Sequence, residues 1–103
     1  MISSLIAAEE LAVGAFSVSY GAHVGIGMEP IVFFGTEAQR AKYLPPMVRG
    51  DLVGAYALTE PTAGSDAMSI RTRAMRTPDG RHYLLNGTKQ FITNGGLADV
   101  FIV

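Results

Sequence analysis

The sequence predicts an α+β chain, in which an all-α N-terminal segment is followed by an incomplete antiparallel β-meander or barrel domain. Two observations predict it. Before residue 52, apolar residues recur at spacings of three or four, as on one face of a helix. After residue 52, short apolar stretches are bounded by turn-forming residues, as in strands. We therefore expect residues 1–52 to be part of a helical domain and residues 53–103 to be part of a β-domain.

Composition is that of a globular interior and excludes several classes of function. Hydrophobic residues make up 49% of the 103 residues and charged residues 17%, which argues against disorder. The net charge of −1 gives no electrostatic reason to expect a nucleic acid partner. The chain has no Cys, and His23 and His82 have no partner at ligand spacing, so we expect no metal site.

The first predicted helix covers residues 2 to about 22. The glycines between Gly21 and Gly27 predict a bend after it, because Gly weakens a helix interior. Leu11 to Met28 carries no formal charge, but its glycines and polar residues favour a core helix with a bend over a membrane span. No targeting segment is visible, since Glu9-Glu10 interrupts the first apolar stretch.

Two shorter helices should follow. The first is Glu29–Phe34, with Gly35 as its C-terminal stop. The second begins after Thr36, an N-cap residue that forms a capping box with Gln39. We expect Pro45-Pro46 to end this helix and residues 47–51 to form a brief turn.

The β part begins with a short apolar strand at Val53–Leu58. Turn signals at Thr77–Gly80, Asn86-Gly87 and Asn94–Gly96 then divide the chain. They predict a meander with strands at about Ile70–Thr77, Arg81–Asn86, Thr88–Thr93 and Asp99–Val103. The chain ends inside a predicted strand, so we interpret it as part of a longer protein.

The stretch from Tyr56 to Asp66, the first motif, is where chemistry is expected. Its strand breaks at Pro61, and Gly64 permits a positive φ or close backbone approach. A buried strand that runs into such a loop suits an anion, phosphate above all. An ordinary capped loop explains the same residues, and neither a Walker nor a Rossmann fingerprint is present.

The second motif is Asn86 to Gly95. Phe91 and Thr93 are two residues apart, so on a strand they would emerge from the same face. The alternative is that Phe91 and Ile92 are core residues on opposite faces of a sheet. Five of the eight Lys and Arg residues lie between Arg71 and Lys89, and the absence of stacking aromatics there favours a solvated face over a binding patch.

The two motifs together resemble the middle-domain signatures of the acyl-CoA dehydrogenases, in the same order. They are Tyr-Ala-Leu-Thr-Glu-Pro-Thr-Ala-Gly-Ser-Asp at 56–66 and Asn-Gly-Thr-Lys-Gln-Phe-Ile-Thr-Asn-Gly at 86–95. The resemblance extends upstream through Phe34–Arg40 and Lys42–Pro45. It implies that residues 53–103 are part of the middle β-domain, which binds FAD and acyl-CoA. Segments 21–23, 69–72 and 94–99 are closer to the very-long-chain branch.

The resemblance also implies a cofactor site for FAD. The first motif would meet the polar edge of the isoalloxazine and, through Gly64 and Ser65, the pyrophosphate, and Ser65 would also border the acyl-CoA. Phe91 would stack on the flavin, where many members carry Trp; Phe keeps a π-face but loses area and the indole N–H. The implied cofactor-binding residues are Tyr56, Ala57, Leu58, Thr59, Gly64, Ser65, Phe91, Ile92 and Thr93.

The implied reaction is α,β-dehydrogenation of a fatty acyl-CoA thioester, with electrons passed to an electron-transferring flavoprotein. The family's catalytic Glu lies in a C-terminal helical domain, so no catalytic residue is expected in this chain, and Glu60 receives a structural role. A full-length homo-oligomer is implied, cytoplasmic in a bacterium or mitochondrial in a eukaryote. An acyl-CoA oxidase or flavin monooxygenase of the same superfamily, a non-catalytic flavin- and acyl-CoA-binding module, and a free-standing small domain remain as alternatives.

Overall fold

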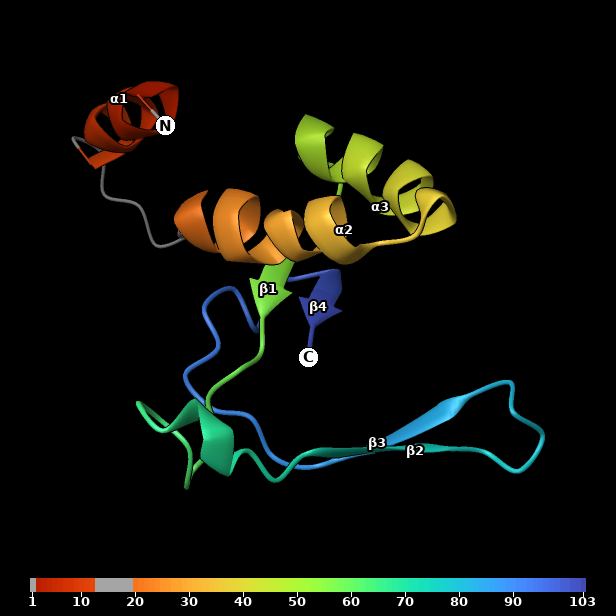
Figure 1. Ribbon diagram of the computed structural model, residues 1–103. Coiled ribbons are helices and arrows are strands. Elements are labelled where there is room, and N and C mark those ends of the chain that lie inside the picture. Colours follow the sequence, from red (N-terminus) through yellow and green to blue (C-terminus); the bar gives the residue numbers. More distant parts are fainter. Residues whose placement is uncertain (1, 13–19) are drawn as a thin grey trace. The chain divides into compact units, whose positions relative to one another are not determined.

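The computed structural model describes residues 2–12 and 20–103, and the α-helices precede the strands along the chain, as predicted (Figure 1). Two compact units form: unit 1 comprises Met1–Tyr56 with Thr93–Val103, and unit 2 comprises Ala57–Ile92. No described helix is both long and apolar enough to cross a membrane. The elements are α1 (Ile2–Ala12), π-helix η1 (Ala22–Met28), α2 (Glu29–Phe34), α3 (Glu37–Arg49), β1 (Gly54–Tyr56), 3₁₀-helix η2 (Ala67–Ser69), β2 (Arg73–Arg76), β3 (Tyr83–Asn86) and β4 (Val100–Ile102).

The expected bend at the glycines is not present. Within the predicted first helix, α1 is observed, and residues 13–19 lie outside the described residues. The π-helix η1 runs directly into α2. A Cβ added to Gly27 would lie 3.3 Å from the carbonyl carbon of Gly54. The same Cβ would lie 2.6 Å from the Ala22 carbonyl oxygen, so a side chain at Gly27 would clash within η1 as well as crowd β1.

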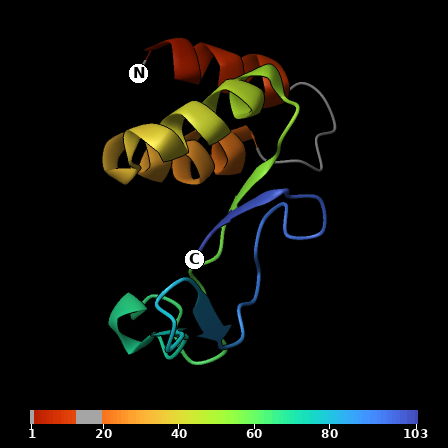
Figure 2. The same cartoon turned by 90° about the vertical axis from the view of Figure 1, so that its right-hand side faces the viewer.

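The predicted capping box at the start of α3 is confirmed. The Thr36 hydroxyl accepts a hydrogen bond from the Gln39 N–H at 3.2 Å, and the Gln39 side chain accepts one from the Thr36 N–H at 2.8 Å. These bonds satisfy donors that a helix start otherwise leaves unpaired. Helices α2 and α3 lie side by side in unit 1 (Figures 1 and 2).

The predicted end of α3 at Pro45-Pro46 is wrong, because the helix continues to Arg49. Each Pro removes a backbone N–H, but burial holds the following turn in place: Met47 is 0% exposed and packs with Met28 and Ile31. Gly50 then ends the helix with φ +81°, and its N–H donates to the Met47 carbonyl at 3.1 Å.

His23 joins three elements of unit 1. Its Nδ1 accepts the Gly54 N–H at 2.9 Å, and its Nε2 lies 3.0 Å from the Met47 carbonyl oxygen. Because Nδ1 accepts, Nε2 carries the proton and donates to Met47. The ring therefore connects η1 to the last turn of α3 and to the first residue of β1.

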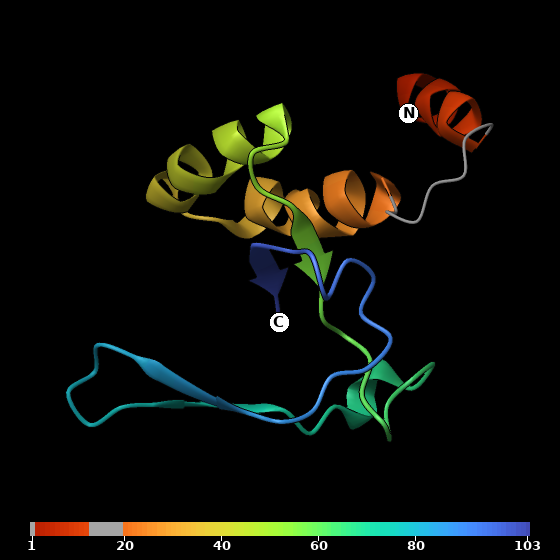
Figure 3. The ribbon, with the colours of Figure 1, turned by 180° about the vertical axis from the view of Figure 1, so that it is seen from behind.

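The last strand does not continue a meander. Strand β4 pairs in parallel with β1, with Gly54 opposite Val100 and Tyr56 opposite Ile102 (Figure 3). Asp99 sets this register: its side chain accepts the Val53 N–H at 2.9 Å, and its own N–H donates to the Val53 carbonyl at 2.9 Å. Parallel pairing requires a long crossover connection, which the intervening part of the chain supplies.

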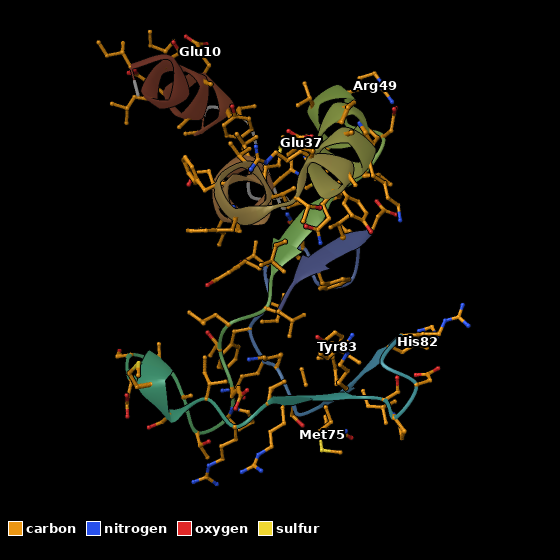
Figure 4. All side chains as sticks on the ribbon, turned by 45° about the vertical axis from the view of Figure 1, so that its right-hand side comes forward. Glu10, Glu37, Arg49, Met75, His82 and Tyr83 are labelled. Carbon is orange, nitrogen blue, oxygen red and sulfur yellow. The ribbon has the colours of Figure 1, made fainter. Side chains whose placement is uncertain are left out.

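Unit 2 contains one antiparallel hairpin, β2–β3, in which Arg73 pairs with Asn86 and Arg76 with Tyr83. Met75 and Tyr83 point away from each other, to opposite faces of it (Figure 4). The predicted turn at Thr77–Gly80 is confirmed, with the Gly80 N–H donating to the Thr77 carbonyl at 2.8 Å and Gly80 at φ +69°.

The expected hairpin at Asn86-Gly87 and the expected strand at Thr88–Thr93 are wrong. A Cβ added to Gly87 would lie 2.8 Å from the Cα of Thr72. Gly87, which follows β3, therefore packs closely against Thr72, which precedes β2. Phe91 has φ +56°, which is incompatible with a strand. The described residues form two separate two-stranded sheets and no closed barrel.

Candidate functional site

The parts of the two motifs that belong to unit 2, residues 57–66 and 86–92, lie side by side. The Gln90 N–H donates to the Thr59 carbonyl at 2.9 Å, and the Lys89 ammonium donates to the Leu58 carbonyl at 2.9 Å. The Gln90 amide nitrogen lies 3.3 Å from the Glu60 carbonyl oxygen. The end of the first motif's strand is therefore fixed to the middle of the second motif through backbone and side-chain hydrogen bonds.

Glu60 is the most buried charged group of this junction, at 4% exposure. Its carboxylate accepts the N–H groups of Arg71 at 2.7 Å and Thr72 at 2.9 Å, and the Lys89 ammonium lies 2.9 Å away. The Thr72 side chain, the Arg71 N–H and the Lys89 ammonium lower the pKa of Glu60 to about 2. The Thr72 hydroxyl is buried and has no hydrogen-bond partner among the described residues. It therefore lowers the pKa of Glu60 by lying near the carboxylate. A carboxylate with so low a pKa is a poor general base near neutral pH.

The rest of the first motif is a tight turn followed by an exposed loop. The N–H groups of Glu60 and Ala63 each donate to the other's carbonyl, at 3.0 and 3.1 Å, which closes the turn around Pro61 and Thr62. Gly64 and Ser65 follow and are exposed. Gly64 does not have a positive φ, and a Cβ there would meet nothing within 4 Å. Within the described residues, neither backbone conformation nor packing therefore requires Gly at this position.

Phe91 is placed differently from the expectation. It does not share a strand face with Thr93, since neither residue lies in a strand. The residue is 86% exposed and its φ is +56°, an unusual conformation for a bulky residue. The alternative of Phe91 as a core residue within this chain is therefore wrong. Such strained, exposed residues are concentrated at ligand-binding sites.

The predicted site residues are divided between the two units. Unit 2 contains Ala57, Leu58, Thr59, Gly64, Ser65, Phe91 and Ile92, with Ala57 buried and Leu58, Thr59 and Ile92 half-buried. Tyr56, the half-buried last residue of β1, and Thr93 belong to unit 1.

Lys89 also lies in a different environment from the one expected. It was expected on a solvated face with the neighbouring arginines, but its side chain is 15% exposed and paired with Glu60. No local pattern could have identified this pair, because its members are 29 residues apart and belong to different motifs. The other four basic residues of that stretch, Arg71, Arg73, Arg76 and Arg81, are exposed as expected.

Unit 1 contains a cavity of about 490 Å³ that lies among α2, α3 and β4. None of the residues predicted to bind cofactor lines it. Its lining residues are Pro30, Ile31, Phe34, Gly35, Gln39, Tyr43, Asp99, Val100, Phe101 and Ile102.

Two family models match this chain and together cover most of it. The acyl-CoA dehydrogenase N-terminal domain matches residues 1–51, and the acyl-CoA dehydrogenase middle domain matches residues 55–103. The matches therefore meet between the helical part and the β part of the sequence.

Individual proteins are also similar to this chain. A probable acyl-CoA dehydrogenase of Bacillus subtilis is 55% identical over 103 residues, which are 99% of this chain and 17% of that protein. The human mitochondrial very long-chain specific acyl-CoA dehydrogenase is 50% identical over 99 residues, which are 96% of this chain and 15% of that protein. The crystal structure of an acyl-CoA dehydrogenase complexed with FAD from Bacillus anthracis superposes with a TM-score of 0.79 at 59% identity, covering 81% of this chain and 14% of that one. This chain thus spans about one sixth of the relatives' length.

Proposed function

Because this chain belongs to the acyl-CoA dehydrogenase family, we propose that the full-length protein catalyses FAD-dependent α,β-dehydrogenation of fatty acyl-CoA thioesters. The observation that carries the proposal is the junction of the two motifs, where Gln90 bonds to Thr59 and Lys89 to Glu60. A flavin site requires donors for the ring's polar edge and an apolar surface for its face. Unit 2 contains both the Thr59 hydroxyl, which can donate, and the exposed Phe91 ring, an apolar surface.

The residues present fit a flavin. Phe91 offers an exposed aromatic face in a strained conformation, which no packing within the described chain explains. Thr59 offers a hydroxyl in the first motif, and its backbone carbonyl accepts from the N–H of Gln90, the residue before Phe91. A Cβ at Gly64 would meet nothing within 4 Å, so the loop backbone there is open to close approach. When bound, FAD would accept the hydride that leaves the substrate β-carbon. We propose that it is held by Tyr56, Ala57, Leu58, Thr59, Gly64, Ser65, Phe91, Ile92 and Thr93.

In this proposal, the chain's own residues bind and orient, and they do not move protons. The Thr59 hydroxyl would donate to the ring's polar edge, Phe91 would cover its face and exclude water, and Ser65 would contact both pyrophosphate and acyl-CoA. Glu60 is already ionised and bonded to three donors, which supports a base located elsewhere in the full-length protein. The site would then use residues from more than one domain.

The test is an anaerobic titration of the full-length protein with a saturated fatty acyl-CoA. We expect the purified protein to carry flavin, the oxidised flavin band to bleach, and a 2-enoyl-CoA to form. Added electron-transferring flavoprotein should restore the band. Rapid reoxidation by air with product bound would favour an oxidase or monooxygenase, and flavin that no acyl-CoA bleaches would favour a non-catalytic binding module.

A further inference from the structure

Glu60 and Lys89 form a buried ion pair whose members belong to different motifs. The pair is closed by a contact of 2.9 Å between Lys89 Nζ and Glu60 Oε1, with side-chain exposures of 15% and 4%. Lys89 also donates to the Leu58 carbonyl, and Glu60 also accepts the N–H groups of Arg71 and Thr72. Both charges therefore have additional hydrogen-bond partners, which a buried ion pair needs if it is to be stable.

The bonds of this pair join three segments of unit 2. Glu60 lies at the start of the Pro turn, and its carboxylate accepts hydrogen bonds from the two residues that precede β2. It also bonds to Lys89, which belongs to the second motif. Exposed loops of this kind are otherwise mobile, and here the ion pair is the charged contact that links them. Removing either partner would leave the other as an uncompensated buried charge.

The pair is adjacent in sequence to the residues expected to contact the flavin. Thr59 immediately precedes Glu60, and Phe91 is two residues after Lys89. The backbone of Gln90, between Lys89 and Phe91, is bonded to the Thr59 carbonyl at 2.9 Å. A positive φ at an exposed Phe persists only when neighbouring bonds fix the backbone, and Lys89 and Gln90 supply those bonds on its N-terminal side.

We propose that Glu60 and Lys89 act as a positioning pair for the flavin site, holding Thr59 and Phe91 at a fixed separation. This inference rests on the proposed function, because it assigns the pair a role toward the flavin. Neither side chain contacts the flavin or the substrate: Glu60 acts through Lys89 and the backbone at Arg71 and Thr72, and Lys89 acts through the backbone on either side of it.

The test uses the full-length holoprotein with Lys89→Met, which keeps an unbranched side chain of similar length but removes the ammonium. We expect FAD affinity to fall by about 100-fold, since breaking a buried charge pair is costly. The visible circular dichroism of the flavin that remains bound should change, because its geometry toward Phe91 changes. Lys42→Met is the matched control: Lys42 is an exposed lysine over the Tyr43 ring in unit 1, and it should leave both readouts unchanged.

Two further variants keep the proposal falsifiable if Lys89→Met folds poorly. Lys89→Arg retains charge and donors and should hold FAD within about 10-fold of the wild type. Glu60→Gln combined with Lys89→Met removes both charges, and its loss of affinity should be smaller than the product of the two single losses.

The outcomes separate the two proposals. A wild-type protein that binds no FAD would contradict the proposed function itself. If the wild type binds FAD but Lys89→Met keeps both its affinity and its visible dichroism, the positioning role is wrong. The same conclusion follows if Lys42→Met weakens FAD binding as much as Lys89→Met, or if the double variant shows the full product of the single losses.

Discussion

At the scale of single residues, His23 shows how one side chain can satisfy two buried backbone groups. Its ring bonds to the Gly54 N–H and the Met47 carbonyl, and Ala in its place would leave both groups without those partners. Each orphaned group costs about 1–3 kcal/mol. We expect His23→Ala to increase amide exchange at Gly54 by about 30-fold, equivalent to about 2 kcal/mol. Hydrogen exchange of the full-length protein measures it.

The control for this prediction is His82→Ala. His82 is exposed, and it is its backbone N–H and carbonyl that form hydrogen bonds with the Thr77 hydroxyl. Its substitution should change exchange at Gly54 by less than a factor of about 3. Equal effects of the two variants would show that the His23 ring does not hold Gly54.

Gly87 carries a second prediction at this scale. An added Cβ would lie 2.7 Å from the Thr72 Cβ and 2.8 Å from its Cα, distances that require the backbone to shift. We expect Gly87→Ala to destabilise the protein by about 1–3 kcal/mol, as overpacking does, measured as a lower urea midpoint. Gly96→Ala is the control, because a Cβ at Gly96 meets nothing within 4 Å; similar midpoints for the two variants would contradict the clash.

At the scale of elements, the start of α3 depends on Thr36. Thr36→Ala removes the hydroxyl that accepts from Gln39 and should cost about 1 kcal/mol. Thr36→Ser keeps the hydroxyl and should cost less than about 0.5 kcal/mol. Amide exchange in the first turn of α3 distinguishes them, and equal protection in both variants would assign the helix start to packing instead.

The elements also show what could be predicted from sequence and why. The α3 capping box and the turn ending at Gly80 are local: their bonds join residues three apart, so their sequence signals are contained in a short window. The parallel pairing of β4 with β1 and the ion pair of Glu60 with Lys89 join distant residues. No periodicity encodes such contacts.

The predictions that are wrong fail for the same reason: contacts between distant residues override a local sequence signal. Pro45 and Pro46 usually end a helix, but the burial of Met47 against Ile31 keeps the last turn of α3 helical. Asn86-Gly87 usually forms a hairpin, but Gly87 is needed beside Thr72. In the candidate site, the resemblance suggests which residues bind the cofactor, and that assignment stays a prediction. The positive φ of Phe91 could not be predicted, because it depends on bonds that a sequence does not display.

At the scale of the whole molecule, Glu60 makes stability depend on pH. Its pKa falls from an ordinary 4.5 to about 2 in the folded chain, so the unfolded chain binds the proton more tightly. The stabilisation is complete above about pH 5 and is lost as the pH falls toward 2. We expect the difference in unfolding free energy between wild type and Glu60→Gln to shrink over this window. Asp51→Asn, in an exposed ion pair with Arg49, should show little effect at any pH.

The distribution of apolar side chains predicts how residues 1–103 behave on their own. Among the described residues, four of the seven buried hydrophobic residues are Ala, so the core is small. The hairpin carries apolar side chains on both faces, and Met75, Tyr83, Leu84 and Leu85 are 55% to 64% exposed. An antiparallel sheet can leave one face in water, but it normally covers an apolar one.

We therefore expect the isolated chain to unfold over a broad temperature range and to bind a hydrophobic dye, whereas the full-length protein should unfold sharply and bind little dye. Leu85→Ala tests the cause. It should change stability by less than about 0.5 kcal/mol in the isolated chain, where Leu85 is exposed, but by about 2–3 kcal/mol in the full-length protein, where other segments would bury it. A sharp transition of the isolated chain without dye binding would contradict this prediction, because residues 1–103 would then form a complete folding unit despite their exposed hairpin.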